Sequence, residues 1–135
     1  MKREILFLMV LLFSTQLMFA QLHISTNLRQ DAVYNDETQS YDKTAEDQPG
    51  VTFIDFSANY TLFTHKTKKM SSTYSVTSSE TNDEDETILF DIVSDVGNTY
   101  TMVLDVNNSQ VFFLYEVDGK IYLIRHNIKK LWLDK

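Results

Sequence analysis

The chain has no cysteine, so it forms no disulfide bond and offers no thiol for lipid attachment. A domain of this size without disulfides depends on side-chain packing for its stability. That dependence is more typical of a bacterial envelope protein than of an animal extracellular module, in which disulfides usually supplement a small core.

Basic side chains are also few. The chain has 12 Lys and Arg against 19 Asp and Glu, which gives a formal net charge of −7. Binding to DNA or RNA requires clustered Lys and Arg against the phosphates, and anionic lipid makes the same demand. The charge balance therefore argues against a general nucleic-acid binder and against adhesion to an anionic membrane.

Glycine is scarce too, and turns account for the three that are present. The chain has no Gly-x-Ser-x-Gly nucleophile elbow and no glycine-rich phosphate loop ahead of a helix. Its three histidines are far apart, without the close pairs of a structural zinc site. The acidic run 80–86 lacks the glycine and the spacing of an EF-hand calcium loop. We therefore predict no catalytic residue, no metal site and no cofactor.

The longest apolar run, residues 5–13, is well short of the roughly 20 residues of a membrane-spanning helix. It follows Lys2 and Arg3 and precedes the small residue Ala20, which is the order of a secretory signal peptide. We predict cleavage after Ala20, with Gln21 as the first mature residue, and export to the periplasm or the medium. An uncleaved anchor is the alternative.

The mature chain divides by composition at Gly50. Residues 21–50 are polar, with a weak hairpin predicted around 35–38, and residues 51–135 form the predicted β domain. There, β-rich runs cover 51–56, 60–65, 70–78, 87–94, 99–106, 110–117 and 120–126, with a polar loop at 79–86. Asp118-Gly119 between apolar runs is a strong hairpin signal. Residues 127–135 fit a helix or a last strand equally well.

These runs predict an all-β fold of roughly seven to nine strands, joined in succession by short turns. Consecutive hairpins make an antiparallel up-and-down meander, whose two edges are removed if it closes into a barrel. We predict a small lipocalin-like barrel or a strongly curled sheet, with a two-sheet β-sandwich as the alternative.

Three segments carry a resemblance to a known group of proteins: residues 94–100 (Ser-Asp-Val-Gly-Asn-Thr-Tyr), 63–67 (Phe-Thr-His-Lys-Thr) and 72–74 (Ser-Thr-Tyr). With the Phe-Ala-Gln sequence at 19–21, they resemble small exported proteins of unknown function from Bacteroidota. The resemblance implies an envelope or secreted location and carries over no catalytic residue.

Aromatic side chains on the strands are the richest feature of the sequence. They fit a packed core, and they also fit the wall of a barrel that holds one small ligand. The residues predicted to line such a ligand site are Phe63, Phe90, Tyr100, Phe113, Tyr115 and Tyr122.

Two basic clusters follow predicted strand ends, one at 65–69 and one at 125–130. If the meander closes, both could face the same rim and bind an anionic group; the alternative is simple charge balance on an acidic protein. The predicted rim consists of His65, Lys66, Lys68, Lys69 and Arg125.

These observations predict a non-catalytic binding protein of the cell envelope, with a small apolar or amphipathic ligand between the aromatic strands. A protein partner bound through the apolar run 111–115 is the alternative, and a small secreted hydrolase is less favoured. No nucleic-acid partner and no stable membrane insertion after cleavage are expected.

Overall fold

The computed structural model describes residues 21–134, so the predicted signal peptide lies outside the described residues. This part of the chain consists of strands and turns. The strands are β1 (Gln21–Asn35), β2 (Ser40–Lys43), β3 (Gln48–Phe56), β4 (Leu62–Lys66), β5 (Ser71–Asn82), β6 (Thr87–Ser94), β7 (Thr99–Asp105), β8 (Gln110–Val117) and β9 (Lys120–Asp134).

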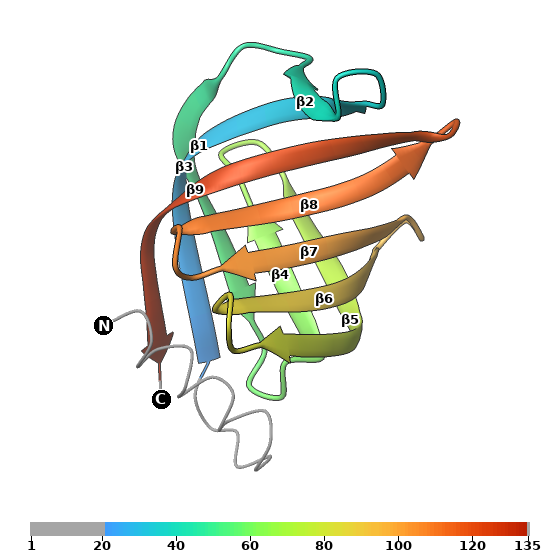
Figure 1. Cartoon of the computed structure of the whole chain (residues 1–135). Helices are drawn as coiled ribbons and strands as arrows, with labels where there is room; N and C mark the ends of the chain where they lie inside the picture. The colour runs from blue at the N-terminus through green and yellow to red at the C-terminus, as the bar shows by residue number, and fades with distance from the viewer. Residues whose placement is uncertain (1–20, 135) are drawn as a thin grey trace.

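Eight of the nine strands form a closed antiparallel barrel (Figure 1). The order is β1-β3-β4-β5-β6-β7-β8-β9, and β9 returns to pair with β1 from Gln21↔Asp134 to Val33↔Tyr122. β2 lies outside this ring and pairs only with the end of β1. The predicted up-and-down barrel is confirmed, and the two-sheet sandwich is excluded.

Two boundaries differ from the prediction, and the structure settles the alternative left open at the C-terminus. Residues 21–50 are not set apart from the domain, because β1 pairs with both β3 and β9 and closes the barrel. The polar loop predicted at 79–86 is shorter, since β5 continues to Asn82 against β6. Residues 127–134 belong to β9, so the strand reading of the C-terminus is the correct one. In each case pairing with a neighbouring strand outweighs the polar composition of the segment: β1 pairs with β3 and β9, and the end of β5 pairs with β6.

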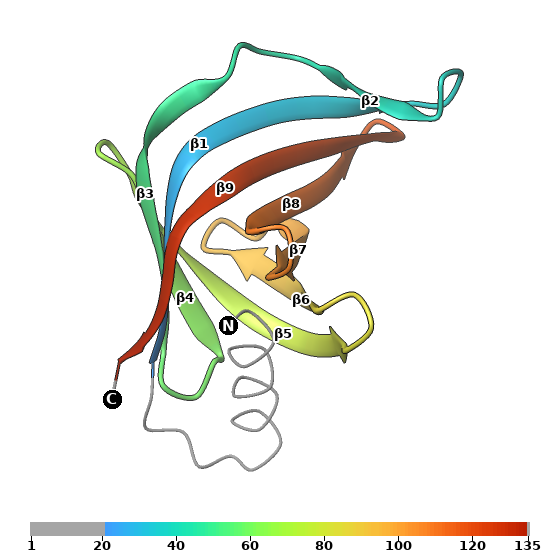
Figure 2. The ribbon, with the colours of Figure 1, turned by 60° about the vertical axis from the view of Figure 1, so that its left-hand side comes forward.

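The β8–β9 hairpin forms where the sequence predicts it. Asp118 and Gly119 both have positive φ, 51° and 79°, as a two-residue type I′ turn requires. The predicted first hairpin is also present, with Tyr34 of β1 opposite Tyr41 of β2. Both hairpins lie at the end where β1, β8 and β9 extend beyond the other strands (Figure 2).

The packed core fills one end of the barrel. Alternate residues of each strand face inward, as Ile88, Phe90 and Ile92 of β6 do, each at most 1% exposed. The ring of Phe56 lies within 5.1–5.6 Å of the rings of Tyr60, Phe63 and Phe90. Full burial of one such large apolar side chain stabilises the fold by roughly 1.5–3 kcal/mol.

A bulge in β1 changes which of its residues face inward. The register of β1 against β3 and β9 shifts between Thr26 and Leu28. Before the shift the buried residues include Leu22 and Ile24, and after it the alternation is displaced by one position. Arg29 is therefore paired opposite His126, which is buried.

Candidate functional site

The other end of the barrel interior is polar and aromatic. Six strands contribute to it: β1, β4, β5, β7, β8 and β9. We call this group the mouth cluster, and it consists of Arg29, Asp31, His65, Tyr74, Tyr100, Tyr115, Tyr122 and His126.

An ion pair on β1 lies among these side chains. Arg29 donates from Nε to Oδ1 of Asp31 at 2.8 Å and from Nη2 to Oδ2 at 3.2 Å. The two side chains are 40% and 21% exposed. A bidentate contact fixes the guanidinium plane while using two of its five N–H donors. The remaining N–H groups of Arg29 are available to a further acceptor.

Two imidazoles meet beside this ion pair. The rings of His65 and His126 lie 5.3 Å apart with their planes at 88°, and His65 stacks on Phe113 at 5.7 Å. Burial, aided by the charge of Arg29, lowers the pKa of His65 to about 4. Burial, followed by the effects of His65 and Arg29 and opposed by Asp31, lowers the pKa of His126 to about 3. Both rings are therefore neutral at pH 7.

One nitrogen of this pair lacks a hydrogen-bond partner. His126 is 2% exposed, and its Nδ1 contacts no donor or acceptor within residues 21–134. His65 shares a hydrogen bond of 3.3 Å between Nε2 and Oγ1 of Thr52. A buried polar atom without a partner lowers the stability of the fold by about 1–3 kcal/mol, so such an atom usually pairs with an ordered water molecule or a ligand.

His126 lies in the wall of a pocket of about 460 Å³. The pocket lies between the first half of β3 and the β4–β5 turn, which projects beside β3 in Figure 2. We call it the histidine pocket. Its wall includes Arg29, Val51, His65, Lys68, Lys69 and His126.

A second hollow, of about 510 Å³, lies on the tyrosine side of the cluster. It is lined in part by Tyr100 and Tyr115, together with the carboxylates Asp91 and Glu116. The Tyr115 ring stacks on Tyr122 at 5.3 Å and meets Tyr100 edge-on at 5.6 Å. We call this hollow the tyrosine groove.

The phenol groups of Tyr74 and Tyr115 are protonated at neutral pH. Burial raises the pKa of Tyr74 and of Tyr115 above the usual value. The neighbouring Tyr100 acts in the same direction on both groups, whereas Arg29 opposes it. The hydroxyls of Tyr74 and Tyr115 are therefore neutral hydrogen-bonding groups at the mouth.

The structure divides the six predicted ligand-lining aromatics into two sets. Phe63, Phe90 and Phe113 are at most 4% exposed and belong to the packed core. Tyr100 and Tyr115 line the tyrosine groove, and Tyr122 stacks on Tyr115.

The predicted rim divides as well. His65, Lys68 and Lys69 are brought together in the wall of the histidine pocket. Lys66 is exposed opposite Phe53 on β3, and Arg125 lies 5.5 Å from the Phe112 ring, on the opposite side of β9 from His126.

Sequence reasoning did not select Arg29, Asp31 or Tyr74 for the site. The β1 bulge brings Arg29 and Asp31 into the barrel, and a period-two pattern does not show where such a bulge lies. Tyr74 alternates with Ser and Thr on β5, which is typical of a half-exposed strand. The signal that could have pointed to it is its spacing of two from Val76, a residue packed against the core.

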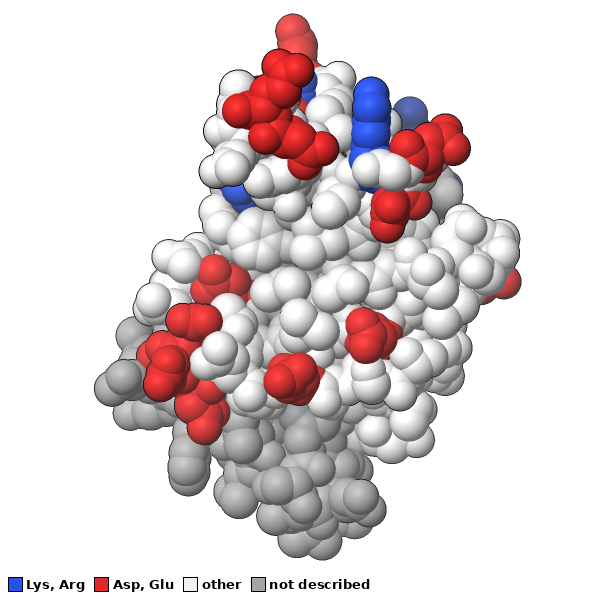
Figure 3. Space-filling model, turned by 45° about the vertical axis from the view of Figure 1, so that its right-hand side comes forward, with Lys and Arg blue, Asp and Glu red and all other residues white. Residues whose placement is uncertain are grey.

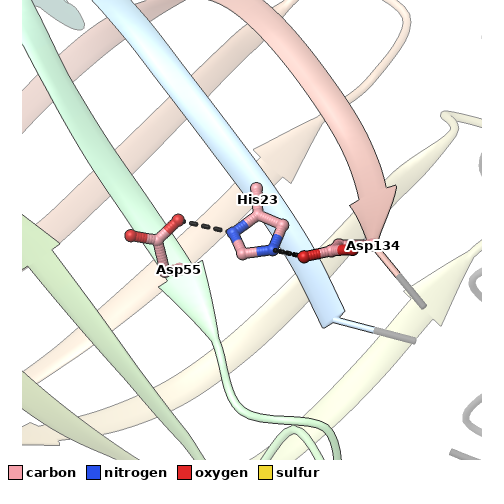
Figure 4. Close-up of polar contacts among 3 residues, drawn as sticks. All are labelled: His23, Asp55 and Asp134. Carbon is pink, nitrogen blue, oxygen red and sulfur yellow. Dashed lines mark hydrogen bonds and ion pairs between the residues drawn. The ribbon is translucent and has the colours of Figure 1, made fainter. Parts of the chain in front are cut away.

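A second polar cluster lies outside the mouth, at the seam of β1, β3 and β9 (Figure 4). His23 Nδ1 lies 2.6 Å from Oδ1 of Asp55, and its Nε2 lies 3.5 Å from Oδ2 of Asp134. The His23 ring stacks on Trp132 at 5.2 Å. This cluster holds three neighbouring strands together, and we assign it a structural role.

In the space-filling view most of the face shown is uncharged, and its charged side chains are mainly acidic, with a few Lys and Arg side chains at the upper end (Figure 3). Within residues 21–134, no group of three or more His, Asp or Glu side chains is arranged to hold a metal ion. The same part of the chain contains no helix of the length and apolar character needed to span a membrane.

Comparison with known proteins finds no matching family model, no matching characterised protein and no matching solved structure. The resemblance to exported proteins of Bacteroidota therefore identifies no family. The structure supports the all-β barrel architecture, which the strand pattern of the sequence predicts.

Proposed function

We propose that this protein is a non-catalytic binding protein that takes one small amphipathic molecule at the polar end of its barrel, in the histidine pocket. The packed core fills the opposite end of the barrel, so the ligand would bind at the mouth and not deep between the aromatic strands. A volume of about 460 Å³ lies within the range of small-molecule sites in proteins.

The observation that carries this proposal is the unpartnered Nδ1 of His126. The side chain is 2% exposed, so water is largely excluded, and the residue lies in the wall of the histidine pocket. A ligand atom that pairs with this nitrogen would recover the free energy that its desolvation costs.

The electrostatics of the cluster favour binding over catalysis. An imidazole whose pKa is about 3 or 4 is a weak base at neutral pH, far from the value that suits general acid–base work. Both oxygens of the Asp31 carboxylate already accept hydrogen bonds from Arg29, so neither is free to act as a base on a ligand.

Export is part of the same proposal and rests on the order of charge, apolar run and small residue in positions 1–20. The intact mass of the protein recovered from outside the cytoplasm tests it. We expect a chain that begins at Gln21, and a mass that includes the first 20 residues would contradict cleavage.

Native mass spectrometry of the protein purified from its own source tests ligand binding. We expect a mass increment of one small molecule, and loss of that increment in the variant Val51→Trp, which places a large ring in the pocket wall. Val96→Trp is the matched control, because Val96 is 77% exposed in the β6–β7 turn, and it should keep the increment. A bare monomer that shows no thermal shift with any member of a lipid and metabolite panel would contradict the proposal.

A further inference from the structure

We infer that the ligand of the histidine pocket is an amphipathic carboxylate, whose head group lies at Lys68 and Lys69 and whose largely apolar body extends along the β3 wall, with one uncharged polar group that pairs with Nδ1 of His126. This inference rests on the proposed function, since it names the chemical class that the same site would take.

Charge distinguishes the histidine pocket from the other hollows of the barrel. Its wall carries Arg29, Lys68 and Lys69 and no Asp or Glu. The tyrosine groove, in contrast, carries two carboxylates and no Lys or Arg. A third hollow, beside the β1–β2 hairpin, has three carboxylates and one lysine. On a chain with a net charge of −7, the histidine pocket is therefore the place where an anion meets attraction instead of repulsion.

The cations of this pocket are available to a ligand. Within the described chain, Lys68 and Lys69 form no ion pair, and both side chains are exposed on the β4–β5 turn. The turn itself is ordered, because the backbone N–H groups of Lys69 and Met70 both donate to Oγ1 of Thr67. Arg29 adds the N–H groups that its contact with Asp31 leaves unused.

The depth of the pocket favours an uncharged and partly apolar group. His65 and His126 are neutral there, and the charge of the nearby Arg29 is already paired with Asp31, so burial of a charged ligand group beside the two rings would cost free energy. Pro49, Val51 and Met70 supply apolar wall near the lysines. A charged rim above a neutral interior matches one anionic head group attached to an apolar body.

Isothermal titration calorimetry with decanoate and decanol tests this inference, because the two differ in head-group charge and share the apolar body. We expect the parent protein to bind decanoate about tenfold more tightly than decanol, the ratio that one charge-assisted contact supplies. The double variant Lys68→Gln/Lys69→Gln should bind the two equally. Higher salt should reduce the preference, since the lysines are exposed.

The control is Lys66→Gln/Lys129→Gln, which removes the same net charge from positions outside the pocket and should keep the preference. Equal affinity of the parent for decanoate and decanol would overturn the carboxylate inference and leave ligand binding intact. Tighter binding of decyl phosphate than of decanoate, by more than about tenfold, would overturn it in favour of a phosphate head group. If decanoate, decanol and decyl phosphate all fail to bind, the carboxylate inference is overturned. The proposed function is contradicted as well only if the native mass spectrum shows no bound molecule.

Discussion

His65 of β4 and His126 of β9 meet inside the barrel, with ring centroids 5.3 Å apart, although β1 and β3 separate their strands in the sheet. Closure of the barrel creates this contact, since it turns both side chains toward a common interior. The pair is therefore sensitive to the integrity of the closed fold and to protonation, and both sensitivities lead to measurable predictions.

The buried imidazoles predict a loss of stability in mild acid. In the unfolded chain each histidine takes up a proton near pH 6.5, whereas in the folded protein the pKa values are about 4 for His65 and about 3 for His126. The unfolded state thus binds more protons below pH 6.5, so the free energy of unfolding falls as the pH is lowered toward 4. Each imidazole contributes roughly 1.4 kcal/mol per pH unit at most in this window.

Urea unfolding at several pH values between 7 and 4 measures this slope. His65→Gln/His126→Gln should flatten the part of the slope that lies above pH 4.5, where carboxylates add little. Thr52→Val removes a hydrogen-bond partner of His65 without removing a titrating group, and it should leave the slope unchanged. An equal slope in the parent and in the double variant would contradict burial of the neutral rings.

Because one face of β3 packs in the barrel core and the other is exposed, substitutions on the two faces should differ strongly in their effect on the free energy of unfolding. Phe56 is 2% exposed and contacts three aromatic rings, whereas Phe53 on the same strand is 43% exposed. Phe56→Ala should lower the free energy of unfolding by about 3–5 kcal/mol, because it leaves a cavity. Phe53→Ala should cost less than about 1 kcal/mol. Similar losses for the two variants in urea unfolding would mean that β3 is not oriented as described.

At Gly119 in the β8–β9 turn, a larger residue should lower the free energy of unfolding through backbone strain, without a steric clash. Gly119 has φ 79°, and no atom lies within 4 Å of the position a Cβ would take. Gly119→Val should therefore cost more than about 1 kcal/mol through backbone strain alone. Gly119→Asn should cost less, since Asn tolerates positive φ better than Val. A Val variant as stable as the parent would place the turn elsewhere.

The sequence predicts the fold better than it predicts the site. Alternation in β6 and the Asp118-Gly119 turn are local signals, and both persist in the structure because nothing non-local opposes them. Arg29 enters the interior only because of the β1 bulge, and a one-residue shift of that kind leaves no mark in the polar composition of β1.

The aromatic side chains illustrate the same limit. The sequence does not distinguish Phe90 from Tyr100 as a ligand-lining residue, since each alternates with outward-facing residues on a β-strand. The position of each ring along the barrel axis decides whether it lies in the core or at the groove, and strand register sets that position. Phe90 lies opposite Met102 in the packed core, whereas Tyr100 lies opposite Ile92 beside the tyrosine groove. Register depends on pairing between strands, which the pattern of one strand does not contain.

The most direct test of the histidine pocket as the binding site is long-range ¹H–¹⁵N NMR of the imidazole nitrogens. The spectrum is recorded with and without the small molecule that co-purifies, or with 10-hydroxydecanoate if none does, since its hydroxyl can pair with Nδ1. We predict that Nδ1 of His126 shifts on binding while the nitrogens of His23, on the outer seam, stay unchanged. A ligand that binds without moving the His126 resonances would contradict the account.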